Sequence, residues 1–347
     1  MSITPQPGGD EERELHESEP GGAPGPVRNG IDCMIADEFY ALRNMGVGLV
    51  TNHSGVTLDG RTTIDALLES DQLHLVKIFT PEHGLTGDVA DGEPIPDSVD
   101  AASGVPVVSL FGERDRPDDE DLEGLDVVLF DIQDVGCRFY TYIATLGYVL
   151  EACAANRVRV LVLDRPNPVN GSDVEGPSSD AAHESFTNYH PLPLRYGMTM
   201  GELARLFNSE REIGADLRVA TMAGWQRDLW QDQTGQQWVN PSPNIRDLSA
   251  AALYPAIGLL EGTNLSVGRG TSEPFHIIGA PWIDGQALAG RLEAAQLPAM
   301  RYEAVEFTPA ERRHPHAGQK CGGVRVLIEE HADAVPTALG VELVRAL

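Results

Sequence analysis

A carboxyl group at the predicted tip of a strand is the clearest candidate for chemistry in this sequence. The segment Thr80-Pro81-Glu82-His83-Gly84 follows an apolar run, and Glu82 is its acid. Desolvation beside an apolar strand can raise the pKa of a carboxyl group, which can then serve as a general acid. Pro81 stiffens the turn, and Gly84 permits close approach of a ligand. We predict that Glu82 and His83 are catalytic; the alternative is an exposed turn pair.

Two aspartates are candidates for a second carboxylate. Asp131 and Asp134 lie in the segment Asp131-Ile132-Gln133-Asp134-Val135-Gly136. Residues three apart in a strand or tight turn face different directions, so we expect only one of them to point toward a ligand. Two carboxyl groups across a scissile bond are what glycoside hydrolysis usually requires, although such a pair could also bind Mg²⁺ or cap a helix. The sequence leaves the choice between Asp131 and Asp134 open.

Further polar and aromatic residues could bind a ligand. Arg138 offers a guanidinium for a carboxylate, while Tyr140 and Tyr142 offer rings for a sugar face, although such rings more often belong to a core. A glycine-rich stretch over residues 260–271 could line a pocket, but a Gly-rich loop alone is weak support. The predicted binding residues are Asn52, Gln133, Arg138, Tyr140, Tyr142, Arg195, Tyr196, Glu261, Asn264, Arg269 and Thr271.

The candidates in the first half follow short apolar runs that indicate strands. These runs cover residues 47–51, 75–79, 105–110, 127–131 and 158–164, with helical patterns at 62–69 and 142–155. Continuous β-branched runs are typical of strands buried on both faces of a parallel sheet. The sequence therefore predicts an α/β fold, with a Rossmann-like doubly wound parallel sheet over residues 27–180. Open sheets of this kind bind ligands at the carboxyl ends of their strands, where the candidates lie.

The second half indicates a smaller α+β domain over residues 181–347. Thr199, with Glu202 three residues later, marks the start of a helix. Strands are predicted at 217–222, 276–280, 302–307 and 324–329, and helices at 250–260 and 285–295. We expect the site in a cleft between the two domains.

Charge limits the classes of partner. The chain has 53 acidic and 25 basic residues, a net charge of −28. Such a surface repels nucleic acid and anionic lipid, so neither is an expected partner. Residues 1–26 are acidic and rich in Gly and Pro, which predicts a disordered tail. That tail does not resemble a signal peptide, so we expect a cytoplasmic protein; a periplasmic or extracellular location is the alternative if the start is misassigned.

Several motifs are absent from the sequence. There is no apolar run of about 18 residues, as a membrane span needs. The four cysteines form no Cys-x-x-Cys pair, and there is no Walker A segment, Gly-x-Ser-x-Gly elbow, His-Glu-x-x-His or dinucleotide fingerprint. We therefore expect no metal and no cofactor.

With these motifs in place, the chain resembles the exo-β-N-acetylmuramidase family of glycoside hydrolases. The resemblance rests on Pro81-Glu82-His83-Gly84 and on residues 48–52, 130–136, 138–142, 164–168, 175–177, 194–199, 241–244, 260–271 and 321–324. It implies a Rossmann-like domain with a smaller domain across a cleft. It also implies release of N-acetylmuramic acid from the non-reducing ends of peptidoglycan fragments, with Glu82 catalytic.

The resemblance leaves the mechanism open between inversion, retention and assistance by the 2-acetamido group. The lactyl carboxylate of a muramyl sugar would suit Arg138, Arg195 or Arg269. A muropeptide- or glycan-binding protein without catalytic activity is the alternative function.

Overall fold

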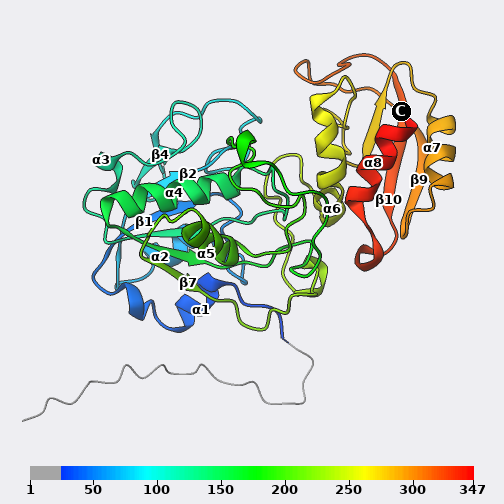
Figure 1. Cartoon of the computed structure of the whole chain (residues 1–347). Coiled ribbons are helices and arrows are strands. Elements are labelled where there is room, and N and C mark those ends of the chain that lie inside the picture. The colour runs from blue at the N-terminus through cyan, green and yellow to red at the C-terminus, as the bar shows by residue number, and fades with distance from the viewer. Residues whose placement is uncertain (1–24) are drawn as a thin grey trace, which may run out of the picture.

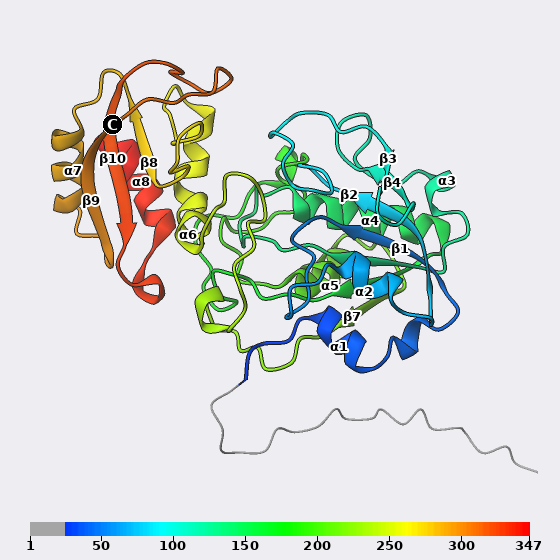
Figure 2. The same ribbon diagram turned by 180° about the vertical axis from the view of Figure 1, so that it is seen from behind.

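A computed structural model gives the structure of residues 25–347, so the tail predicted over residues 1–26 lies almost wholly outside the described residues. Two units follow one another along the chain, and each is built on its own sheet (Figures 1 and 2). The first holds a seven-stranded, mostly parallel sheet with helices, and the second a small antiparallel sheet. The predicted fold class, a Rossmann-like sheet with a second, smaller α+β unit, is confirmed.

The large sheet has the strand order β3-β4-β2-β1-β5-β6-β7, and all neighbours are parallel except β3 and β4. The order reverses between β1 and β5, so their carboxyl ends flank the topological switch point at which open α/β sheets bind ligands. The strands are β1 (Gly46–Thr51), β2 (His74–Thr80), β3 (Ser98–Val99), β4 (Pro106–Ser109), β5 (Val127–Asp131), β6 (Arg159–Leu163) and β7 (Leu217–Ala220).

Helices cover both faces of this sheet. In both views α4 and α5 lie over one face and α1 and α2 over the other (Figures 1 and 2). Side chains of β5 alternate accordingly, since Val128 and Phe130 pack in the cluster with α4, while Val127 and Leu129 pack in the cluster with α1. Burial on both faces explains why β5 is apolar up to Asp131. The helices are α1 (Gly30–Ala36), α2 (Thr63–Leu68), α3 (Asp119–Leu122), α4 (Tyr142–Asn156) and α5 (Met200–Glu210).

The small unit has the antiparallel strand order β8-β10-β9. Helix α6 lies on its side nearest the large unit and packs against α8, while α7 packs against β9 and β10 (Figures 1 and 2). Its elements are α6 (Leu248–Ile257), β8 (Ile277–Ala280), α7 (Gly285–Ala294), β9 (Met300–Phe307), β10 (Cys321–Ile328) and α8 (Pro336–Ala346). Across residues 25–347, every helix is too short or too polar to span a bilayer.

Two predictions in the second half have different outcomes. The helix after Thr199 is confirmed as α5, and its capping box joins Thr199 and Glu202. The strand at 217–222 forms as β7, but it pairs in parallel with β6 and therefore belongs to the large sheet. Its assignment to the smaller domain is wrong, because a four-residue edge strand carries no signal for the sheet that it joins. We propose that the first unit extends beyond residue 220, rather than ending at the predicted residue 180.

Candidate active site around Glu82

Glu82 follows β2 and is held at both carboxylate oxygens. Its Oε2 accepts a hydrogen bond from the Thr141 hydroxyl at 2.8 Å, and its Oε1 accepts one from the Gly92 amide at 3.1 Å. Thr141 is the N-cap of the fifteen-residue helix α4, and the amino end of a helix favours a nearby anion. Glu82 is only partly buried. The carboxyl group is therefore oriented and still reachable by a ligand.

The loop after Glu82 is built from left-handed turns. His83 has φ of 74° and is buried, and its Nδ1 donates to the Val89 carbonyl at 2.8 Å. A side chain at Gly87 would collide with the ring of His53, so a glycine is required there. His83 therefore fixes the loop that carries Glu82. Its predicted catalytic role stays a prediction, and the structure gives it a positioning contact.

Two buried tyrosines, Tyr140 and Tyr142, pack against each other at the amino end of α4. Tyr140 and Tyr142 are buried, with ring centroids 4.8 Å apart, and the Tyr142 hydroxyl donates to the Pro241 carbonyl at 2.8 Å. Burial, assisted by the nearby Glu82 carboxylate, raises the pKa of Tyr142 far above its ordinary value. Because both rings are enclosed, the prediction that they stack on a sugar is not supported.

A cluster of charges joins the Glu82 loop to the small unit. Asp91, next to Gly92, pairs with Arg269 at 2.9 Å, and Arg269 also binds Glu261. Burial acts to raise the pKa of Asp91, but the Arg269 guanidinium, a backbone hydrogen bond and the charges of Arg313 and His314 together outweigh it, so the pKa is lowered. Asn244 donates to the same Asp91 carboxylate at 3.2 Å. Two predicted binding residues, Glu261 and Arg269, are thus brought toward Glu82.

Two other residues of the glycine-rich stretch have local contacts. The Thr271 hydroxyl donates to the Gly268 carbonyl at 2.6 Å and so closes a turn. Asn264 is exposed and lines a surface groove with Trp282 and Leu347 at the end of the small unit. We see no contact that brings either side chain to Glu82.

Asp131 is the anionic half of a buried ion pair. Its two oxygens accept hydrogen bonds from Nε and Nη2 of Arg165 at 2.6 and 2.9 Å, and Thr63 donates to it as well. Asp131 has no exposed surface. A carboxylate occupied in this way cannot reach a substrate, so the structure contradicts its proposed role as a second catalytic carboxylate.

Asp134 is also buried, beside another predicted binding residue. The Tyr196 hydroxyl and the Gly136 amide both donate to its Oδ2, and its Oδ1 meets no donor among residues 25–347. Burial raises the pKa of Asp134 to about 6, although the bond from Tyr196 opposes the shift. Tyr196 is itself buried, so this pair lies inside the large unit.

Arg195 is a structural residue. It is 1% exposed, and its guanidinium binds Glu175 at 2.6 Å, Asp173 at 3.1 Å and the Val169 carbonyl. With these partners it cannot also bind a ligand carboxylate, so the structure contradicts that prediction for Arg195.

Asn52 and Gln133 lie at the switch point, after β1 and β5. The Asn52 side chain donates to the Tyr142 hydroxyl at 2.9 Å and accepts from the Ser54 amide at 2.9 Å. Gln133 lines a cavity on the other side of this turn. Both are therefore at the predicted edge of the sheet, but neither contacts Glu82.

Two residues of the site were not predicted. Thr141 stands directly before an apolar helical pattern, and the N-cap preference of threonine is a signal that could have found it. Asp91 has no comparable signal, because its partner Arg269 is 178 positions away in the chain. Within residues 25–347, no group of three or more His, Cys, Asp or Glu side chains is arranged to hold a metal ion.

Comparison with known proteins identifies the family of this chain. The N-terminal family model of exo-β-N-acetylmuramidase NamZ matches residues 47–249, and the C-terminal model of the same family matches residues 252–347. The peptidoglycan β-N-acetylmuramidase NamZ of Bacillus subtilis is 43% identical over 317 residues, which cover 91% of this chain and 76% of that protein.

Two solved structures share the fold. Both are DUF1343 family proteins from Bacteroides fragilis. The first has a TM-score of 0.86 and 34% identity, covering 92% of this chain and 82% of its own. The second has a TM-score of 0.72 and 33% identity, covering 87% and 76%. The chain therefore belongs to the exo-β-N-acetylmuramidase NamZ family.

Proposed function

We propose that this chain is an exo-acting glycoside hydrolase that releases N-acetylmuramic acid from the non-reducing ends of peptidoglycan fragments. The observation that carries the proposal is the oriented, partly exposed Glu82 carboxyl in a chain 43% identical to a peptidoglycan β-N-acetylmuramidase. A carboxyl group held by two donors at an accessible position suits a general acid that protonates the leaving oxygen.

The second catalytic group is proposed to be Asp91 rather than Asp131. Asp91 is partly exposed, it follows Glu82 in the same loop, and Arg269 contributes to the lowering of its pKa. An ionised carboxylate can stabilise the positive charge that develops on the sugar ring. Asp131 is fully occupied by Arg165.

The test of this function uses two chromogenic substrates that differ only in the lactyl ether. The wild-type chain is expected to release N-acetylmuramic acid from 4-nitrophenyl β-N-acetylmuramide and to leave 4-nitrophenyl β-N-acetylglucosaminide intact. On glycan chains, the sugar should appear from the ends, without an early fall in chain length. Saturable binding of the muramide with no release would instead support a binding protein.

Recognition of the lactyl carboxylate is assigned to Arg138. Its Nη1 donates to the carbonyls of Pro177 and Leu192, and no carboxylate among residues 25–347 forms an ion pair with it. Arg195 and Arg269, in contrast, each bind two carboxylates. Partial burial lowers the pKa of Arg138, as expected for a cation without a counter-ion. A ligand carboxylate would supply the missing charge.

Arg138→Ala is expected to raise the KM for a muramide by roughly 10- to 100-fold, with little change in kcat. A hydrogen bond to a charged group contributes about 1.5–3 kcal/mol, which is the size of that change. Arg205→Ala is the matched control, because Arg205 is exposed on α5. Steady-state kinetics on the muramide and on its lactyl methyl ester would check the assignment. An equal rise in KM for the ester would contradict it, because the ester has no carboxylate.

A further inference from the structure

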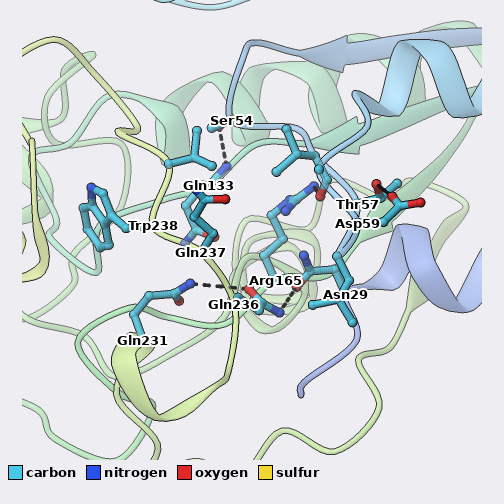
Figure 3. Close-up of a pocket in the computed structure, with 14 residues that line it drawn as sticks. Asn29, Ser54, Thr57, Asp59, Gln133, Arg165, Gln231, Gln236, Gln237 and Trp238 are labelled. Carbon is cyan, nitrogen blue, oxygen red and sulfur yellow. Dashed lines mark hydrogen bonds between the residues drawn. The ribbon is translucent and has the colours of Figure 1, made fainter. Parts of the chain in front are cut away.

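A cavity of about 230 Å³ opens at the switch point of the large sheet, apart from Glu82. It lies over the carboxyl ends of β1, β5 and β6, and Figure 3 shows the side chains that line it. Leu58, Asp59, Gly60 and Gln237 are exposed at its rim. The cavity is below the 300–1,000 Å³ typical of drug-sized ligands, so it suits a single small ring.

The chain segment 238–241, held by hydrogen bonds, lies between this cavity and the candidate active site. His53 donates to the Asn240 carbonyl at 2.5 Å, and the Tyr142 hydroxyl donates to the Pro241 carbonyl at 2.8 Å. Trp238, on the cavity side, donates to the Asn240 side chain at 3.0 Å. The lining residues all belong to the large unit, whereas Glu82 lies near the contacts with the small unit.

Five side-chain amides line the cavity: Asn29, Gln133, Gln231, Gln236 and Gln237. Some of their capacity is used internally, since Gln236 donates to Asn29 at 2.7 Å and Gln133 donates to the carbonyls of Asp134 and Pro166. The buried Oε1 of Gln231 receives no donor from residues 25–347, and the Gln133 side chain contacts its neighbours only through Nε2; the two residues are 6% and 9% exposed. The cavity therefore offers acceptors that lack donors.

One donor of a buried arginine also has no protein partner within the described part of the chain. Arg165 is 3% exposed and binds Asp131 through its Nε and Nη2 edge, while Nη2 also donates to the Val56 carbonyl at 2.8 Å. This contact leaves Nη1 on the opposite edge, and no acceptor among residues 25–347 binds it. Arg165 lies among the labelled side chains of Figure 3. A ligand oxygen could accept from Nη1.

The charges of the lining residues are compensated. Asp131 balances Arg165, and Arg61 binds Asp59 at 3.0 Å at the rim. A charged ligand would find no free counter-ion, so the cavity favours an uncharged one. The unmet groups are a donor at Arg165 and acceptors at Gln133 and Gln231, which is the pattern that an acetamido group, with its C=O and N–H, would satisfy.

We propose that this cavity binds one uncharged N-acetylated hexosamine ring, with Trp238 against the ring and the amide side chains on its polar groups. An indole presents a flat apolar face, and carboxamides both donate to and accept from hydroxyl groups. The site is separate from Glu82, and its occupancy does not depend on the proposed hydrolysis.

The test titrates methyl β-N-acetylglucosaminide into the full chain by calorimetry and ligand-observed NMR. We expect saturable binding that loses at least about 10-fold in affinity in Trp238→Ala and in Gln231→Leu. Trp282→Ala is the matched control, because Trp282 is 60% exposed on the small unit and should leave the affinity unchanged. Gln237→Ala, at the exposed rim, is a second variant that tests the site if Gln231→Leu does not fold.

Four outcomes would overturn the proposal. One is an absence of saturable binding, and another is an equal loss of affinity in the Trp282 control. The third is displacement of the glucosaminide by N-acetylmuramic acid, which would place the sugar at the Glu82 site. Preferential binding of N-acetyl-alanyl-isoglutamine amide would identify the cavity as a peptide site instead, and would equally reject the sugar. Each readout is a binding constant, so a chain that failed to hydrolyse muramides would still give a clear result.

Discussion

Glu82→Gln is expected to lower kcat for a muramyl disaccharide by at least 10²- to 10⁴-fold while leaving the fold intact, since general acid catalysis is typically worth that factor. The substitution fits the local contacts. The Thr141 hydroxyl can turn to accept from the new amide, and the Gly92 amide can still donate to the remaining oxygen. The melting temperature should therefore stay close to that of the wild-type protein.

Leaving-group dependence separates an acid from other roles of Glu82. A nitrophenolate departs without protonation, so the variant should lose less activity on an aryl muramide than on the disaccharide. Glu93→Gln is the matched control, because Glu93 is exposed in the same loop and the charge change is identical. Turnover of the disaccharide within a few-fold of wild type would reject Glu82 as the acid. Equal losses on both substrates would assign it another catalytic role.

Asp131→Asn is expected to destabilise the protein by about 3–5 kcal/mol. The substitution leaves Arg165 as a buried cation without its anion, and the Asn amide would face a guanidinium nitrogen that needs an acceptor. Differential scanning fluorimetry should show a fall in Tm of roughly 5–15 °C. Urea unfolding should give a matching loss of free energy.

Asp216→Asn is the control that makes the same substitution in an exposed ion pair instead of a buried one. Asp216 accepts from Nε of Arg159 at 2.9 Å, but both partners are exposed, and surface pairs contribute about 0–1 kcal/mol. Replacing both members of the buried pair, as in Asp131→Asn with Arg165→Met, should recover part of the lost stability because no unpaired charge remains. If Asp131→Asn were as stable as Asp216→Asn but inactive, Asp131 would be catalytic after all.

The elements of the fold were largely predictable, because strong periodic patterns marked them. The five apolar runs of the first half became β1, β2, β4, β5 and β6, and the strands predicted in the second half also formed. Weak patterns were missed, such as α1 and the two-residue β3. The position of β7 could not be predicted, since its pairing with β6 depends on the path of the chain over fifty residues.

The site was predictable only at the level of single residues. Glu82 stood out because a glutamate between proline and histidine at a strand tip is a local signal. The structural roles of Asp131 and Arg195 could not be predicted from local sequence signals. A carboxylate at a strand end looks the same in sequence whether it faces a substrate or a buried guanidinium, and Arg165 lies 34 positions from Asp131.

The pairing of Asp91 with Arg269 has a thermodynamic consequence. Gly92, which holds Glu82, sits directly beside an aspartate anchored to a residue of the C-terminal half. The order of the Glu82 loop is thus linked to the folded state of the small unit, and local unfolding that broke the Asp91–Arg269 pair would release the loop. Where such local opening costs less free energy than global unfolding, heating would abolish hydrolysis before the large sheet melts.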